Sequence, residues 1–440
     1  MIIWINNPFD FIPGEGARLQ RYGLLAQALV KAGHQVIWWS SDWNHLEKAR
    51  REVAVGSRSR QLGDGAVEIR LIKTMPYFKN IGLRRLISHW LYAREWAREC
   101  SREHKKSDLI ICSAPPLSTG WFMRGICKRL GCVGVIDVMD VWPETFERVV
   151  PAWMLWPLRW MAKRVYESAD GISTAGDSYL EVVQRYLECA DVKPMYRCYH
   201  GIEMEVGREV AVGSGSRQLV VSTSILELPN FRTSPTALCP MPLPTGNLKL
   251  VYIGNMGKGY DLVTLVEAVS ELIDAGHAIH LDLAGKGVQE ENVQSLARTK
   301  TESIRFHGVV TGDTLCTLIE QADVGIIPIF ANTHVAVPYK LADYVAAGLP
   351  VISSLKGETE KLIKRYDAGW CYDAGDVLSL KRAIQACAEE RQTPYEVLRK
   401  QRARQMAEEN FDAGTIYPEF VAWIERLVAR KGASYNSPVL

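Results

Sequence analysis

The chain has 440 residues, 47% of them hydrophobic, and a formal net charge of only +2. This length suits two or three domains with a large core, and the composition excludes a disordered chain or a general nucleic-acid-coating protein. The ten cysteines contain no C-x-x-C pair, which argues against zinc knuckles and redox motifs. No charged leader precedes the first strand, and no apolar run reaches the roughly 18 residues of a membrane span. We therefore expect the protein to reside in a reducing cytoplasm.

One series of elements is predicted twice along the chain. In the first copy a strand at 2–6 is followed by a glycine loop with Gly14 and Gly16, a helix at 19–32 and a second strand at 36–39. The second copy places the corresponding strand, helix and strand at 250–253, 262–274 and 279–283. This alternation is typical of βαβ units, so the predicted fold class is α/β with two Rossmann-like, doubly wound domains.

The rest of the chain fits this division. Further strands are predicted at 109–112, 133–137, 304–309 and 324–328. The predicted domains are 1–200 and 247–412, joined by a Ser/Pro/Gly-rich linker at 201–246, and a final helix at 415–430 is expected to pack back on the first domain. Segments 51–62 and 208–219 agree at eleven of twelve positions. We interpret them as duplicated loop inserts, with a functional arm as the alternative.

The segment 338–353 predicts a short helix followed by a buried strand. Pro338 suits the start of the helix and Gly348 its end, and Lys340 and Asp343 share one helix face. A cation near a helix N-terminus suits a bound diphosphate. The alternative is a surface ion pair on a solvated helix.

The loop 254–259 opens the second domain with a glycine-rich turn ahead of a helix. Bare backbone amides and Lys258 suit phosphate oxygens, and Lys258 and Lys340 are expected to converge on one diphosphate at the carboxyl edge of the sheet. A tight turn with an exposed lysine is the alternative.

Six segments in this order resemble family 4 of the retaining glycosyltransferases: GEGARLQRYGLLAQALVKAGHQV, DVMDVWPE, YIGNMGKGYDLVTLVEAV, IRFHGVV, ADVGIIPI and PYKLADYVAAGLPVIS. The chain is most similar to the bacterial branch of surface-polysaccharide and fucosamine transferases. The resemblance implies a GT-B fold, with two Rossmann-like domains facing a central cleft. It also implies a UDP- or GDP-sugar donor on the C-terminal domain, a glycan or lipid-linked acceptor on the N-terminal domain, and no other cofactor. No D-x-D occurs, so no metal is indicated.

The resemblance also assigns roles to individual residues. Asp343 takes the place of the glutamate that binds ribose hydroxyls, and Val335 stands where the family has a first glutamate. As catalytic residues it implies Lys258 at the leaving diphosphate and Asp140 or Glu144 toward the acceptor hydroxyl, although Asp140 could instead cap a turn. The full donor-binding set is Gly14, Gly16, Arg18, Gly254, Asn255, Gly257, Lys258, Pro338, Tyr339, Lys340 and Asp343.

Two basic segments that contain tryptophan, 79–106 and 151–165, suit peripheral contact with the inner face of a membrane. Solvated helices of the first domain are the alternative. No nucleic-acid partner is expected. The competing functions are a nucleotide-sugar epimerase of the same fold, a non-catalytic nucleotide-sugar-binding subunit and, more remotely, a nicotinamide oxidoreductase.

Overall fold

The computed structural model describes residues 1–15, 18–51, 59–62, 67–80, 82–147, 149–187, 193–204, 247–330 and 333–436. Gly16, most of the duplicated segment 51–62, its second copy and nearly all of the predicted linker lie outside these residues.

The first domain is built on an eight-stranded sheet in the order β10-β9-β8-β7-β1-β2-β6-β5. All neighbouring strands are parallel except β5 and β6. The strands are β1 Ile2–Asn6, β2 Gln35–Ser41, β5 Ser59–Leu62, β6 Val67–Ile72, β7 Leu109–Ala114, β8 Val133–Val138, β9 Gly171–Thr174 and β10 Met195–Arg197. Its helices are α1 Arg21–Lys31, α2 Leu83–Arg102, α3 Leu117–Leu130, α4 Trp156–Ser168 and α5 Asp177–Tyr186, with short turns η1 Glu144–Phe146 and η2 Ala152–Leu155 and a hairpin of β3 Trp43–Asn44 and β4 Ala49–Arg50.

The second domain has a six-stranded parallel sheet in the order β13-β12-β11-β14-β15-β16. The strands are β11 Leu248–Ile253, β12 Ile279–Ala284, β13 Ile304–Gly308, β14 Val324–Ile327, β15 Val351–Ser353 and β16 Gly369–Cys371. The helices are α7 Leu262–Asp274, α8 Glu290–Leu296, α9 Gly312–Gln321, α10 Tyr339–Ala346, α11 Glu358–Tyr366, α12 Val377–Glu390 and α13 Pro394–Asn410, with a short turn η3 Arg298–Lys300. The predicted fold class, two doubly wound α/β domains, is therefore confirmed.

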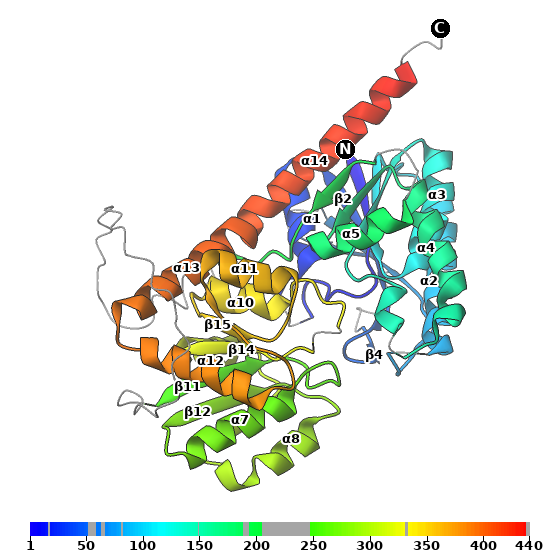
Figure 1. Ribbon diagram of the computed structural model, residues 1–440. Coiled ribbons are helices and arrows are strands. Elements are labelled where there is room, and N and C mark those ends of the chain that lie inside the picture. The colour runs from blue at the N-terminus through cyan, green and yellow to red at the C-terminus, as the bar shows by residue number, and fades with distance from the viewer. Residues whose placement is uncertain are drawn as a thin grey trace.

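The last helix, α14 Ala413–Asn436, crosses back from the second domain and runs along α1 (Figure 1). Its apolar side joins the core of the first sheet, where Phe420 and Ile424 are fully buried. Nε2 of His34 lies 2.9 Å from a carboxylate oxygen of Glu425. The first domain is thus completed by α14, because α1 and β8 leave an apolar surface that this helix covers.

A buried ion pair ties the first domain together. Nε and one terminal nitrogen of Arg21 on α1 each donate to the carboxylate of Asp137 on β8 at 2.8 Å, and both side chains are fully buried. Tyr22 and Ser173 donate to the same carboxylate, each at 2.7 Å. Burial alone would raise the pKa of Asp137, but the charge of Arg21 and these hydrogen bonds bring that pKa below its ordinary value.

We expect Arg21→Met to lower the free energy of unfolding by about 3–5 kcal/mol, because the substitution leaves the Asp137 carboxylate buried and without its cation. Urea denaturation followed by circular dichroism measures this change. Arg164, an exposed residue paired with Glu167 at 3.3 Å, provides the matched control. Arg164→Met should cost about 1 kcal/mol or less. Equal losses in the two variants would contradict a structural role for the buried pair.

Candidate functional site

In each sheet the chain order reverses beside the first strand of the domain. β1 lies between β2 and β7, and β11 lies between β12 and β14. Loops that leave the carboxyl ends of strands at such a reversal form the usual ligand crevice of doubly wound sheets. In the first domain this place holds the loop with Gly14 and Arg18, and in the second it holds the Gly254 loop and α10.

Lys340 on α10 is the central residue of this crevice. Only 8% of its surface is exposed, and its Nζ has no hydrogen-bond partner among the described residues. The Nζ lies 4.2 and 4.3 Å from the ring centroids of Tyr252 and Tyr260. Burial lowers the pKa of Lys340 to about 7, although the nearby carboxylate of Asp343 opposes this shift. The alternative of a surface ion pair on a solvated helix is therefore wrong, because Lys340 is buried.

The loop after β11 brings its backbone up to this lysine. Gly254 has φ +148°, and a Cβ built on it would lie 2.8 Å from the Nζ of Lys340. Tyr252 donates its hydroxyl to the carbonyl of Asn255 at 2.5 Å, which fixes the turn. A side chain at position 254 would therefore fill the space next to the ammonium group.

A second glycine loop, which the sequence reasoning missed, supports the first. A Cβ on Gly285 would lie 1.8 Å from the carbonyl oxygen of Gly254, and one on Gly287 would lie 2.4 Å from the backbone of Met256. The side-chain amide of Gln289 donates to the carbonyl oxygens of Gly257 and Tyr260, at 2.5 and 2.9 Å. The glycine pair directly after β12 is the sequence signal that could have revealed this loop, because two backbones can approach this closely only where side chains are absent.

Asp343 pairs with a residue of the opposite domain. A terminal nitrogen of Arg18, from the first domain, lies 2.6 Å from a carboxylate oxygen of Asp343, whose side chain is 24% exposed. Burial raises the pKa of Asp343, while the charge of Arg18 opposes the shift. Arg18, whose side chain is 49% exposed, thus bridges the two domains at the predicted donor site.

Two further contacts hold the domains together beside this bridge. The ring of Tyr339 stacks on that of His200, with centroids 3.9 Å apart and planes 23° apart. The carboxylate of Glu358 accepts backbone N–H groups of Asp177 and Ser178, at 2.9 and 3.2 Å. From across the domain boundary, Glu358 thus accepts hydrogen bonds from amides at the N-terminus of α5 that have no partner within the helix. Negative charge is favoured at a helix N-terminus.

The remaining predicted donor residues lie in the same loops. Asn255 and Lys258 are exposed, and the backbone of Gly14 has φ +87°. Gly257 is half-buried beside Asn255, and Pro338 is the N-cap residue of α10.

The two predicted acceptor-side acids differ in their surroundings. Asp140 accepts hydrogen bonds from Thr145 Oγ1 at 2.7 Å and Trp142 Nε1 at 3.2 Å, which is the turn-capping arrangement. Burial raises its pKa. Glu144 accepts a hydrogen bond from the hydroxyl of Tyr186 through one carboxylate oxygen. The other oxygen is buried and has no hydrogen-bond partner within the described part of the chain.

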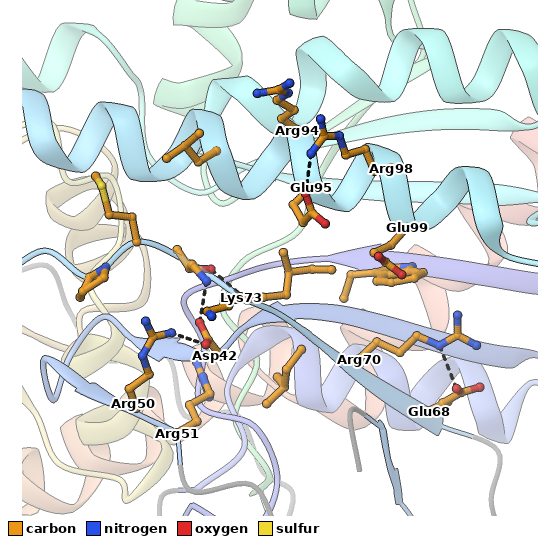
Figure 2. Close-up of a pocket in the computed structure, with 17 residues that line it drawn as sticks. Asp42, Arg50, Arg51, Glu68, Arg70, Lys73, Arg94, Glu95, Arg98 and Glu99 are labelled. Atoms are coloured by element: carbon orange, nitrogen blue, oxygen red, sulfur yellow. Dashed lines mark hydrogen bonds and ion pairs between the residues drawn. The ribbon is translucent and has the colours of Figure 1, made fainter. Parts of the chain in front are cut away.

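The first domain also contains a cavity of about 950 Å³ beside α2 and β6 (Figure 2). Figure 2 shows Arg94, Glu95, Arg98 and Glu99 of α2 along one side, with Glu68 and Arg70 of β6 opposite. The charged side chains that line it are Arg50, Arg51, Arg70, Lys73, Arg94 and Arg98 against Asp42, Glu68, Glu95 and Glu99. The cavity is therefore polar with an excess of positive charge, which suits an anionic ligand.

Several of these cations already have partners. Arg70 contacts Glu68 at 2.8 Å and Arg98 contacts Glu95 at 3.2 Å. Lys73 and Arg94 are exposed and form no ion pair with any described residue. They are the charges that remain for a ligand of this cavity.

Comparison with solved structures shows which fold the protein has. The structure matches sucrose-phosphate synthase from Thermosynechococcus elongatus with a TM-score of 0.70, at 13% identity over 98% of this chain and 99% of that one. It also matches Anabaena HepE in complex with UDP and glucose, with a TM-score of 0.62 at 11% identity over 97% of this chain and 100% of that one. At these identities the likeness concerns the fold, and the predicted GT-B architecture is confirmed.

Sequence comparison finds a family match within the second domain. Residues 247–390 match the family model described as Glycosyl transferases group 1. The chain is also 21% identical over 230 residues to the Escherichia coli protein named "Putative colanic acid biosynthesis glycosyltransferase WcaL". That alignment covers 51% of this chain and 55% of WcaL, about half the length of each.

We expect the affinity for UDP to fall between pH 7 and about pH 8.5, by up to about tenfold per pH unit, if the diphosphate binds beside Lys340. The pKa of the free Lys340 is about 7, so above this pH the neutral lysine must take up a proton to pair with the anion. Phosphate groups titrate near pH 6 and so do not contribute in this range. Isothermal titration calorimetry measures the effect.

The matched control is Lys340→Arg, because arginine keeps its charge throughout this range. The variant should bind UDP with a much flatter pH profile. A wild-type profile that is already flat would show that Lys340 does not meet the diphosphate.

Proposed function

We propose that this protein is a retaining, metal-independent glycosyltransferase that moves a sugar from a nucleoside diphosphate donor to a glycan in surface-polysaccharide biosynthesis. The donor is a UDP- or GDP-sugar and the acceptor is lipid-linked. The observation that carries the proposal is Lys340, a buried ammonium without a hydrogen-bond partner among the described residues, next to the bare backbone of Gly254 at the switch point of the second sheet. A diphosphate supplies the anion that this arrangement lacks.

In this proposal the donor site assembles from both domains. Lys340 and the exposed Lys258 hold the diphosphate, and Asp343 accepts hydrogen bonds from the ribose hydroxyls. Arg18 then turns from Asp343 to the phosphates. Positive charge at the leaving diphosphate stabilises the transition state, in which negative charge builds up on these oxygens. UDP is the first nucleotide to test, since HepE, which shares this fold, was solved in complex with UDP.

The acceptor half of the proposal rests on the first domain. The 950 Å³ cavity offers Lys73 and Arg94 to an anionic acceptor, such as a glycan on a lipid diphosphate. Glu144, with one buried carboxylate oxygen free of hydrogen bonds to described residues, is the stronger candidate to orient the acceptor hydroxyl. Asp140 is the weaker candidate, because its carboxylate already accepts hydrogen bonds from the side chains of Trp142 and Thr145 in its own turn.

A non-catalytic nucleotide-sugar-binding subunit is the second candidate. Val335 stands where the resemblance places the first glutamate of the family, and its side chain is 37% exposed. A site that lacks this carboxylate could bind the donor without turning it over.

A thermal-shift screen against UDP, GDP, ADP, CMP and NAD tests the donor site. A nucleotide at a hundredfold its dissociation constant should stabilise the protein by about 2.7 kcal/mol. We expect one nucleoside diphosphate to respond, Lys340→Met and Lys258→Ala to weaken the response, and Lys361→Met, at an exposed position of α11, to leave it intact.

Donor turnover then separates the candidates. A transferase releases the diphosphate faster when a lipid-linked acceptor is added, an epimerase converts the donor sugar without any acceptor, and a binding subunit does neither. A response to NAD alone would refute the transferase proposal.

A further inference from the structure

Five tryptophans of the first domain lie at its surface. Trp153 and Trp156 are 77% and 66% exposed, and Trp90, Trp121 and Trp160 are between 37% and 45% exposed. Met154, next to Trp153, is also more than half exposed. Such large side chains bury about 150–250 Å² each when packed, so leaving several of them in water needs an explanation.

These residues form one continuous surface, here called the tryptophan face, on α2, α3, η2 and α4. Trp90 of α2 contacts Phe122 of α3 with ring centroids 5.2 Å apart, and Trp121 of α3 contacts Trp160 of α4 at 5.4 Å. Figure 1 shows α2, α3 and α4 together at the outer edge of the first domain. The face therefore extends across three helices, on the outside of the domain.

Helix α2 has two apolar sides, one packed in the core and one that belongs to the tryptophan face. Its inner side supplies Tyr92 and Trp96, which are buried against the sheet. Its outer side carries Leu83, Ile87 and Trp90, which are exposed and stand one helical turn apart. A solvated helix needs only one apolar stripe, so packing on the sheet does not account for this second, exposed stripe.

The same helices carry a large excess of positive over negative charge. Together α2, α3 and α4 contain eleven Lys and Arg residues and only three Glu. The whole chain has a formal net charge of +2, so the remainder carries net negative charge. Lys163 and Arg164 are exposed directly after Trp160, and the guanidinium carbon of Arg164 lies 5.9 Å from the ring centroid of Trp160.

We propose that the tryptophan face docks the protein on an anionic membrane surface, an inference that rests on the proposed function and locates the lipid-linked acceptor. Tryptophan prefers the boundary between headgroups and acyl chains, and Lys and Arg beside it pair with anionic headgroups. No helix within the described residues is long and apolar enough to cross a bilayer, so the contact is peripheral.

The cavity of the first domain supports this orientation. Leu91, Arg94 and Arg98 of α2 line it, and Leu91 is exposed beside Trp90. A membrane on the tryptophan face would therefore lie next to the mouth of the cavity. A lipid-linked anionic acceptor could then enter the cavity without leaving the bilayer.

Flotation of the full chain with vesicles tests the proposal. We expect wild-type protein to float with vesicles of equal parts phosphatidylcholine and phosphatidylglycerol, and much less with phosphatidylcholine alone. The double substitution Trp153→Ala/Trp156→Ala should lower the partition coefficient about tenfold or more, because both indoles lose their place in the interface. Lys163→Gln/Arg164→Gln should lower it by roughly fivefold per cation removed.

The matched control is Tyr395→Ala/Val397→Ala, two residues of α13 in the second domain that are each about half exposed. This variant should float like the wild type, and all variants should keep the wild-type unfolding temperature. The proposal is overturned if the tryptophan variant floats like the wild type or if the wild type ignores anionic vesicles. It is also overturned if sedimentation shows that the face instead joins two copies of the chain.

Flotation requires neither nucleotide nor acceptor, so the experiments can refute the membrane contact and the transferase function independently of each other. Protein that floats but binds no nucleotide would refute the transferase and leave the membrane face standing. Protein that turns over a donor but never floats would refute the membrane face alone.

Discussion

The buried pair of Arg21 and Asp137 is the interaction on which the rest of the structure depends. Besides the carboxylate, Arg21 donates to the carbonyl oxygens of Cys198 and Tyr199, at 2.7 and 2.9 Å. It therefore fixes the last residues of the first domain against α1. The next residue, His200, stacks on Tyr339 and so reaches the start of α10. A continuous series of contacts thus links the start of α10, where Lys340 lies, to a charge pair in the core of the other domain.

The crevice concentrates groups whose burial is costly without a ligand. The ammonium of Lys340 lies against two aromatic rings and has no hydrogen-bond partner among the described residues, and Asp343 depends on Arg18 from across the boundary. Buried polar groups that lack partners are uncommon in folded proteins and gather at functional sites. A nucleoside diphosphate would satisfy these groups together, because its phosphate oxygens can accept from Lys340 and Arg18 and its ribose hydroxyls can donate to Asp343. For this reason we propose a nucleotide ligand here and not a purely structural role.

The first domain joins three features that a lipid-linked acceptor would require. The cavity offers cations, and the tryptophan face carries the side chains that we propose to contact a membrane. Glu144 has a carboxylate oxygen with no hydrogen bond to a described residue. Helix α2 contributes to both places, since Arg94 and Arg98 line the cavity and Trp90 belongs to the tryptophan face. The first domain thus combines a rigid sheet with a specialised outer layer of helices.

The sequence by itself determined the elements and their order, because hydrophobic period and glycine placement are local. The predicted helix 262–274 and strand 2–6 have the same bounds as α7 and β1. Each of the two predicted βαβ units lies in a sheet of its own. It also singled out Lys340, Asp343 and Arg18. Only the tertiary structure decided that Lys340 is buried, that Arg18 reaches Asp343 from the other domain, that Gly285 and Gly287 support the Gly254 loop, and that the tryptophans of α4 face outward. These properties depend on which surfaces the folded chain brings together, and no spacing along one segment contains that information.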